Sequence, residues 1–454
     1  MRQLIFVCYN TLIIYENVVK KYGGGSMDSF AARQACRDGR YDEVLAMYGK
    51  AAPDRSWTCW DYYYYAYALR KTKQYKKGRE IARAGMIAFP DFVNLHGIYC
   101  WCLYYLYIQK FDERTQAPED FRRAVDAILK YSQQGPYTPY ALAVWRMVDV
   151  LKNQPGQAGL MGAYLRRLDP DQLPDQEKTV TLKGRERVIA SDRERWYSLM
   201  SRILVKEEKY DDCITLCRQA LNYFPQLHHD NDIWFSYRIA LCLLRQGRVG
   251  EGRQRLENLL KYKQHWILFR GLFFAAQAEG DSAAMRRYGA SAFLAGGEFK
   301  AKVNFMVQFA QALENMGGYE KMAYFHYLLA KRVRMDQHWK VKAELLAKTD
   351  SYAFPEPDRQ ELMDGLHGFW MDEKHAGQTR HKGTIEKILP GSKAGFLREY
   401  GGNQYYFRTA SLYRVRPEEG EKVTFYVEDF FETGKEKPAH RAVDIEPVLL
   451  YDKK

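Results

Sequence analysis

The sequence predicts an array of paired helices followed by a small barrel of short β-strands. Apolar residues recur at helical spacing over most of the chain, and turn-forming residues return roughly every 30–40 positions. From Gly383 onward the pattern changes to short alternating stretches separated by glycines. A chain of 454 residues has room for two to four domains at ~100–200 residues each.

The composition is that of a globular protein. Hydrophobic residues make up 46% of the chain and charged residues 28%, which excludes an intrinsically disordered chain. No window approaches ~20 uninterrupted apolar residues, so we expect no membrane-spanning helix and no membrane partner. Lys and Arg number 69 against 56 Asp and Glu, and the net charge of +13 is compatible with an anionic partner.

The eight cysteines do not form the pattern of a disulfide framework or a zinc site. Cys213 and Cys217 stand four residues apart on one predicted helix face, but no histidine follows at ligand spacing. We interpret the cysteines as reduced, small core residues, which predicts a cytoplasmic protein without a metal or other cofactor.

Residues 1–26 are expected to be a non-native or mis-assigned extension. Asn10 interrupts the apolar run, and no small-x-small cleavage site follows, so a signal peptide is not favoured. Gly23, Gly24 and Gly25 lie a few codons before Met27, as a purine-rich bacterial ribosome-binding site read in frame would encode. We expect translation to start at Met27; the alternative is an engineered linker.

The stretch around Tyr210 shows the helical repeat best. Ser201 is a small residue in the first helix, Tyr210 follows the turn, Ala220 is a late small residue in the second helix, and Pro225 ends it. This pattern resembles the tetratricopeptide repeat (TPR), in which small residues let the two helices of a hairpin pack closely. The resemblance implies an α-solenoid of degenerate TPR-like hairpins, whose concave groove binds a protein partner.

Turn positions place further units and their boundaries. Tyr41 and Tyr75 stand 34 residues apart, and the steps from Tyr210 to Val249, Ser282 and Tyr319 are 39, 33 and 37 residues. Helix breakers interrupt the array twice. We therefore predict an N-terminal array (27–152), an irregular linker (153–190), a C-terminal array (191–349), a linker with a short helix (350–382) and the barrel (383–450).

Two aromatic clusters, Trp60–Tyr67 and Tyr99–Tyr107, fall on predicted first helices. Tyrosine on every face of a helix cannot all be core, because each hydroxyl needs a partner. Two interpretations remain open. In the favoured interpretation most of these rings pack between helices. In the other interpretation some of them line the groove.

The last seventy residues carry five short predicted strands, which is typical of a small Greek-key barrel of the OB type. The stretches from Gly383 to Ile385, Gly395 to Leu397, Tyr405 to Phe407 and Glu419 to Phe425 also resemble the cold-shock domain. The predicted strands are Thr384–Leu389, Ala394–Tyr400, Gln404–Arg408, Lys422–Val427 and Arg441–Pro447.

The cold-shock resemblance implies stacking of single-stranded RNA or DNA bases on aromatic side chains. Phe396 and Tyr406 keep two of the family's aromatic positions, whereas Lys387 replaces its tryptophan and Arg408 its histidine. These replacements remove stacking surfaces and add cations that can pair with phosphates. The predicted nucleic-acid site comprises Lys387, Lys393, Phe396, Arg398, Tyr406 and Arg408.

Charge is distributed unevenly between the two parts. Residues 383–454 contain twelve Lys and Arg and twelve Asp and Glu, so the whole positive excess precedes the barrel. A basic stripe beside the barrel would let both parts hold one strand, whereas separate charges would be ordinary solvated helix faces. The candidate groove residues are Arg286, Arg287, Arg332 and Arg334.

Enzyme signatures are absent from the sequence. It contains no G-x-x-x-x-G-K-[ST], H-E-x-x-H or G-x-S-x-G motif. His367, His375 and His381 are interpreted as part of a helix and linker that dock the barrel on the array, with Phe369 and Trp370 as the apolar anchor, rather than as a metal site.

The sequence therefore favours a non-enzymatic cytoplasmic adaptor that binds a protein through the groove and single-stranded RNA through the barrel. The alternative is a protein-interaction scaffold whose barrel has lost nucleic-acid binding.

Overall fold

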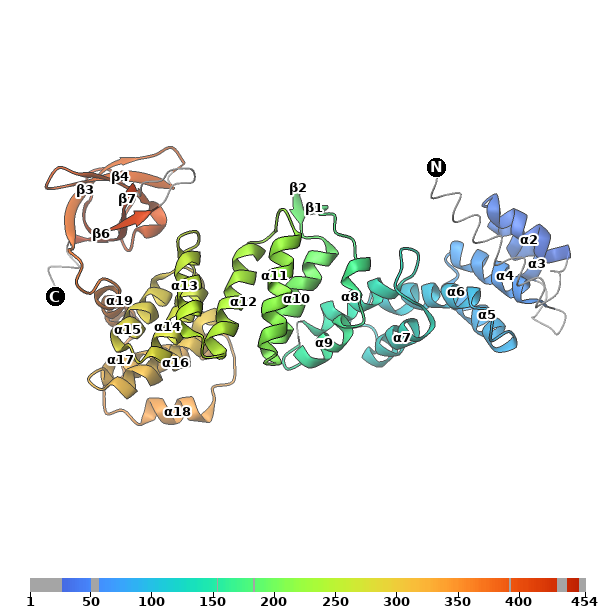
Figure 1. Cartoon of the computed structure of the whole chain (residues 1–454), viewed down its shortest axis with the longest axis horizontal. Helices are drawn as coiled ribbons and strands as arrows, with labels where there is room; N and C mark the ends of the chain where they lie inside the picture. The colour runs from blue at the N-terminus through green and yellow to red at the C-terminus, as the bar shows by residue number, and fades with distance from the viewer. Residues whose placement is uncertain are drawn as a thin grey trace. The chain divides into compact units, whose positions relative to one another are not determined.

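The computed structural model describes residues 27–49, 57–152, 154–182, 184–391, 393–430 and 439–448. Residues 1–26, on which the expected non-native extension falls, lie outside the described residues. The chain divides between Glu207 and Glu208 into two compact units, which are described separately. Figure 1 labels the helices and strands of both units. The boundary between the units comes after the predicted linker (153–190) in the chain and does not lie within it.

The first unit consists of helical hairpins whose close contacts are made by small residues. In the hairpin of α4 and α5, a Cβ on Gly85 would lie 2.7 Å from Tyr62 Cβ, so only glycine permits this approach. Tyr62 and Tyr65 are buried in the same core, which supports the packing interpretation of that aromatic cluster. The helices are α2 (Met27–Arg37), α3 (Tyr41–Gly49), α4 (Cys59–Lys71), α5 (Tyr75–Ala88), α6 (Asn94–Leu103) with a π-helical turn (Tyr104–Ile108), α7 (Pro118–Tyr131), α8 (Tyr140–Leu151), α9 (Ala158–Leu165) and α10 (Asp192–Lys206).

The stretch predicted as an irregular linker contains regular structure. Helix α9 packs against α8 and α10, and a 3-10 turn spans Pro170–Gln172. Strands β1 (Lys178–Leu182) and β2 (Arg185–Ile189) then form an antiparallel hairpin around Gly184, whose φ is +73°. The expectation of irregular structure was wrong here, because a glycine between two short runs that contain β-branched residues is itself a hairpin signal.

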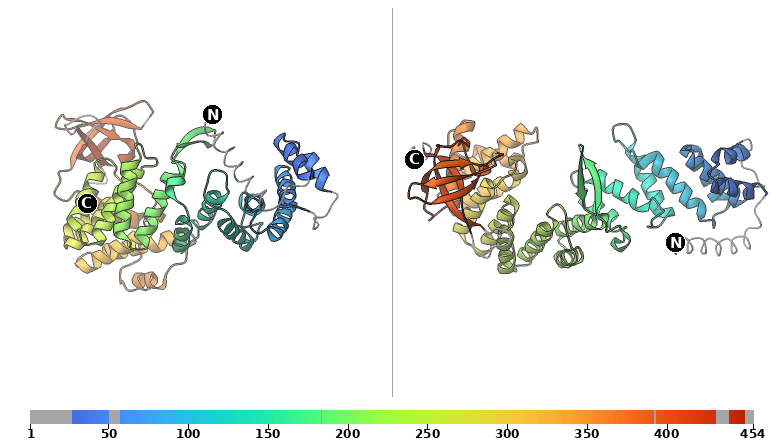
Figure 2. Two further views of the ribbon diagram at one scale, coloured as in Figure 1. Left: turned by 45° about the vertical axis from the view of Figure 1, so that its right-hand side comes forward. Right: turned by 90° about the horizontal axis from the view of Figure 1, so that it is seen from above.

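The second unit continues the hairpins, and its helices α12 to α17 lie side by side (Figures 1 and 2). The turns after α12, α14 and α16 fall where glycines were expected, and Gly247, Gly280 and Gly317 adopt positive φ there. The predicted solenoid of TPR-like hairpins is confirmed. The helices are α11 (Tyr210–Tyr223), α12 (Asn231–Arg245), α13 (Val249–Leu260), α14 (Trp266–Glu279), α15 (Ser282–Leu294), α16 (Phe299–Met316), α17 (Glu320–Asp336), α18 (Ala343–Asp350) and α19 (Arg359–Lys374).

Five strands then close into a barrel in the order β3-β4-β5-β7-β6. All pairings are antiparallel except β5 with β7, and this arrangement is consistent with an OB-like barrel. Ile385, Leu397, Phe407 and Phe425 fill its interior. The strands are β3 (His381–Ile388), β4 (Ala394–Glu399), β5 (Gln404–Arg408), β6 (Lys422–Phe430) and β7 (Ala439–Pro447), and each overlaps a predicted strand.

Helix α19 lies between the helical array and the barrel. On the array side it packs against α15 and α17, and the buried Trp370 donates a hydrogen bond from Nε1 to His326 Nε2 at 2.8 Å. On the barrel side His375 stacks on Tyr426 with ring centroids 3.7 Å apart, and His367 stacks on Tyr413 at 3.6 Å.

Buried charges join the same helix to the barrel. Asp444 of β7 accepts hydrogen bonds from the Lys374 ammonium and, at 2.7 Å, from His375 Nε2. Burial alone would raise the pKa of Asp444, but Lys374 and His375 bring it well below its usual range. Glu446 is held by His367 of α19 and by Arg380, which lies between α19 and β3, so Lys374 and His367 fix strand β7 to α19. Within the described residues, no helix is long and apolar enough to cross a membrane.

Candidate nucleic-acid interface

The outer face of the barrel brings the two predicted stacking residues together. Phe396 of β4 and Tyr406 of β5 are direct cross-strand partners, with ring centroids 5.9 Å apart and planes inclined at 70°. Strand alternation explains this, because Leu397 and Phe407 point into the core and their neighbours must point outward. Both rings are half-buried, and neither belongs to the apolar cluster of Met371, Tyr426 and Val443 that joins the barrel to α19.

Cationic side chains lie around this pair. Lys387 of β3 pairs with Phe396, and Arg408 follows Tyr406 on the same face of β5. Lys393 is exposed immediately before β4. These three cations and the two rings therefore form the face that we call the aromatic face (Lys387, Lys393, Phe396, Tyr406 and Arg408).

Arg398 has a different environment from the other predicted cations. A β-bulge between Ile385 and Lys387 places Glu386 beside it, and the Arg398 guanidinium donates to Glu386 Oε1 at 2.8 and 3.1 Å. Hydrogen bonds from Arg398 and Gln404 hold the pKa of Glu386 below its usual value. Arg398 is thus already paired with a carboxylate, so its attraction for a phosphate is smaller than that of Arg408.

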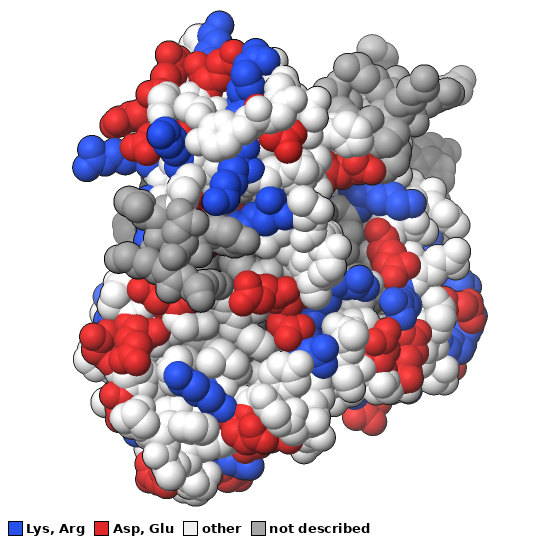
Figure 3. All heavy atoms as spheres, turned by 90° about the vertical axis from the view of Figure 1, so that its left-hand side faces the viewer, with Lys and Arg blue, Asp and Glu red and all other residues white. Residues whose placement is uncertain are grey.

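The four candidate groove arginines have four different sets of neighbours. Arg286 of α15 pairs with Glu373 of α19, whereas Arg287 lines a cavity of about 460 Å³ with Gln378. Arg332 of α17 pairs with Glu356, and Arg334 donates to Asn304. The structure does not bring these four side chains into one site. On the face shown in Figure 3, acidic and basic side chains are interspersed over the barrel and the helices below it.

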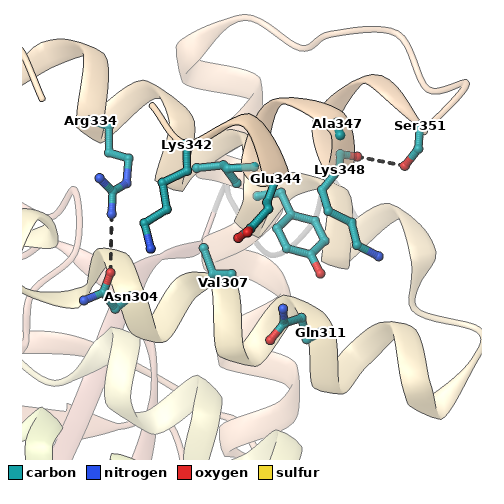
Figure 4. Close-up of a pocket in the computed structure, with 11 residues that line it drawn as sticks. Asn304, Val307, Gln311, Arg334, Lys342, Glu344, Ala347, Lys348 and Ser351 are labelled. Carbon is teal, nitrogen blue, oxygen red and sulfur yellow. Dashed lines mark hydrogen bonds between the residues drawn. The ribbon is translucent and has the colours of Figure 1, made fainter. Parts of the chain in front are cut away.

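A second cavity, of about 590 Å³, lies between α16, α17 and α18. Figure 4 shows side chains of α18 pointing towards Val307 and Gln311 of α16. Glu314 helps to hold α18 in place, since it accepts hydrogen bonds from Tyr327 at 2.7 Å and from Lys348 at 2.9 Å. Burial would raise the pKa of Glu314, but these bonds and one from Tyr352 lower it.

Sequence reasoning missed the residue that extends the aromatic face onto β7. Arg441 is the parallel-strand partner of Tyr406, and it also pairs with Glu428 of β6 at 3.5 Å. Its strand was expected, but its position beside β5 follows only from closure of the barrel. In the part of the chain that the structure describes, no group of three His, Cys, Asp or Glu side chains is placed to hold a metal ion.

No protein-family model and no curated protein sequence matches the chain. Among the solved structures that match is the APC/C hetero-tetramer Cut9–Hcn1, with 11% identity and a TM-score of 0.28 over 76% of this chain. That match covers 65% of the Cut9–Hcn1 chain. A human IFIT1 dimer with m7Gppp-AAAA matches over 81% of this chain and 82% of its own, with 15% identity and a TM-score of 0.24. Both TM-scores are low, and neither likeness bears on partners or activity.

Proposed function

We propose that this protein is a non-enzymatic cytoplasmic adaptor, which binds single-stranded RNA on its cold-shock-like barrel and a protein partner on its helical hairpins. The proposed RNA binding rests on the pairing of Phe396 with Tyr406 on the outer face of the barrel. Bases stack on such rings at ~1–3 kcal/mol each, largely regardless of sequence. Lys387 and Arg408 stand where phosphates of a stacked strand would pass.

The double variant Phe396→Ala with Tyr406→Ala, made in the full chain, tests RNA binding by the barrel. Removing both rings is expected to weaken binding of a short unstructured RNA by ~2–6 kcal/mol. The melting temperature should change little, because neither ring belongs to the barrel core or to the contact with α19. Fluorescence titration and thermal melting of the same samples measure the two quantities.

For the protein partner we propose the cavity between α16, α17 and α18, because three helices form it and its lining combines apolar and polar side chains. Ala347 is exposed and lines this cavity, so Ala347→Trp should fill it without disturbing the core. Leu346→Trp is the matched control, since Leu346 is also exposed on α18 but does not line the cavity.

Purification after crosslinking in cells, followed by mass spectrometry, measures this effect. A partner that wild type and the Leu346→Trp variant recover should fall at least tenfold with Ala347→Trp. Equal recovery from all three proteins would place the partner elsewhere.

The alternative is a protein scaffold whose barrel serves as an end cap. The contacts of Asp444 with Lys374 and of Glu446 with His367 favour it, because they fix the barrel to α19 without any ligand. This alternative expects negligible RNA binding by wild type and by the Phe396→Ala, Tyr406→Ala variant alike.

A further inference from the structure

A cavity of about 860 Å³ lies between the barrel and the turn that joins α13 to α14. Arg408 and Arg441 line it on the barrel side, and Lys261, Tyr262 and Lys263 line it on the helical side. Arg441 is the strand partner of Tyr406, and Arg408 is two residues further along β5. The cavity therefore begins where the aromatic face ends.

Tyr262 has no packing role that would explain an aromatic residue at this position. Its side chain is 82% exposed, although the turn that carries it is well held. The backbone N–H groups of Tyr262 and Lys263 both donate to Leu259 O at 3.0 Å, and the Lys263 ammonium pairs with Asp230 at 2.5 Å. An exposed ring on an ordered turn offers a flat surface for stacking at little entropic cost.

The charge of the cavity favours an anion. Four cations line it, and its two carboxylates already have partners: Glu257 pairs with Arg253 and Asp429 with His440. Among the described residues, no ion pair engages Lys261 or Arg408. Those two cations can meet phosphates without first giving up a carboxylate.

We propose that this cavity carries a single strand of RNA onward from the aromatic face, with one base stacked on Tyr262 and phosphates contacting Lys261 and Arg408. This inference rests on the proposed RNA-binding function. It adds that the helical array supplies part of the RNA site, so the binding path is longer than the barrel alone.

Two unstructured RNAs distinguish the longer path from the barrel site. One of about 4 nucleotides covers the aromatic face alone, and one of about 12 nucleotides reaches beyond it. With the full chain, Tyr262→Ala is expected to weaken binding of the longer RNA about 5- to 150-fold and to leave binding of the shorter RNA unchanged. Tyr262→Phe should bind like wild type, because stacking needs the ring and not the hydroxyl.

The matched control is Tyr137→Ala, which removes a tyrosine that is 80% exposed in the first unit. It should bind both RNAs like wild type. The pair of variants therefore separates loss of a stacking surface at the cavity from loss of any exposed tyrosine.

The phosphate contacts are read from the salt dependence. Lys261→Ala tests the cavity's own phosphate contact, because Arg408 also belongs to the aromatic face. It should reduce the slope of log affinity against log salt for the longer RNA by about 0.7, at ~0.7 per phosphate for single strands, and leave the slope for the shorter RNA unchanged. An unchanged slope for the longer RNA would overturn the assignment of Lys261.

The remaining outcomes separate the inference from the proposed function. If Tyr262→Ala binds both RNAs like wild type while the Phe396→Ala, Tyr406→Ala variant loses both, the inference is wrong and the proposed function stands. If wild type binds neither RNA, both are wrong. If Tyr262→Ala loses the crosslinked protein partner and keeps the longer RNA, the cavity is a protein site and the inference is overturned.

Discussion

At the scale of single residues, His326 shows how a buried polar group fixes the place of α19. The ring is fully buried among Phe293, Phe309 and Trp370. Nδ1 lies 2.7 Å from Met322 O, which can only accept, so Nδ1 carries the hydrogen and Nε2 accepts from Trp370 Nε1. A protonated ring would place two N–H groups against each other, and burial accordingly lowers the pKa of His326 to about 4.

This environment predicts an acid-sensitive fold. The pKa of His326 is about 4 in the folded chain against an ordinary 6.5, so its contribution to stability is present above pH 6.5 and is lost as the pH falls towards 4. Between pH 7 and 5 the loss should be about 2 kcal/mol. Urea unfolding at both pH values measures it. The His326→Gln variant should be less stable at pH 7 but should lose less than wild type on acidification; an equal loss in both proteins would exclude His326 as the cause.

Residue identities on the aromatic face were predictable because strand alternation alone places Phe396 and Tyr406 outside the barrel. The neighbours of a charge were less predictable. The sequence predicts that Arg286 and Arg332 are solvated or line a groove. In the structure Arg286 pairs with a carboxylate 87 residues away, and Arg332 pairs with one 24 residues away. No local pattern encodes such contacts, since they depend on how hairpins stack.

At the scale of elements, periodicity and turn chemistry accounted for most of the structure. The five strands were predicted because each is a short apolar stretch that ends at a turn, although only β4 alternates cleanly and Val423 to Tyr426 of β6 are all buried. Helices α9 and the β1–β2 hairpin were missed, because Pro170, Pro174 and Gly184 were read as breakers of the whole stretch. Breakers bound short elements as often as they abolish them, and α9 is only 8 residues long.

Close approach between helices could be foreseen only in outline. A Cβ on Gly289 of α15 would lie 2.2 Å from Phe309 Cε2 of α16, so glycine at this position is required by the partner helix. By contrast, a Cβ on Gly250 of α13 would meet nothing within 4 Å. The TPR-like pattern predicts that small residues occur, but only the packed hairpins show which glycine is indispensable.

At the scale of the second unit, the position of the barrel depends on buried charge. Asp444 has a positive φ of 48° and faces both Lys374, the last residue of α19, and His375, which caps the helix. Lys374 is half-buried, and the loss of solvent lowers its pKa, but attraction by Asp444 and Glu428 outweighs this and raises the pKa above its ordinary value. Asparagine tolerates the same backbone conformation, so Asp444→Asn removes the charge alone.

Asp444→Asn is expected to release the barrel from α19. Breaking a buried pair costs ~3–5 kcal/mol, because Lys374 would keep only Glu428, at 3.5 Å, as a carboxylate partner among the described residues. The pKa of Asp444 is lowered in the folded chain, so its contribution to the stability of docking is present above about pH 4 and is lost as the pH falls below that value. Wild type should therefore undock in acid, whereas the variant should already be undocked at pH 7. Small-angle scattering and limited proteolysis between α19 and β3 measure the release.

Asp429→Asn is the control, because Asp429 forms only an exposed pair with His440 and its loss should leave the barrel docked. A variant with wild-type scattering and wild-type protection at pH 7 would show that the stacked pair of His375 and Tyr426, together with Glu446, holds the barrel without Asp444.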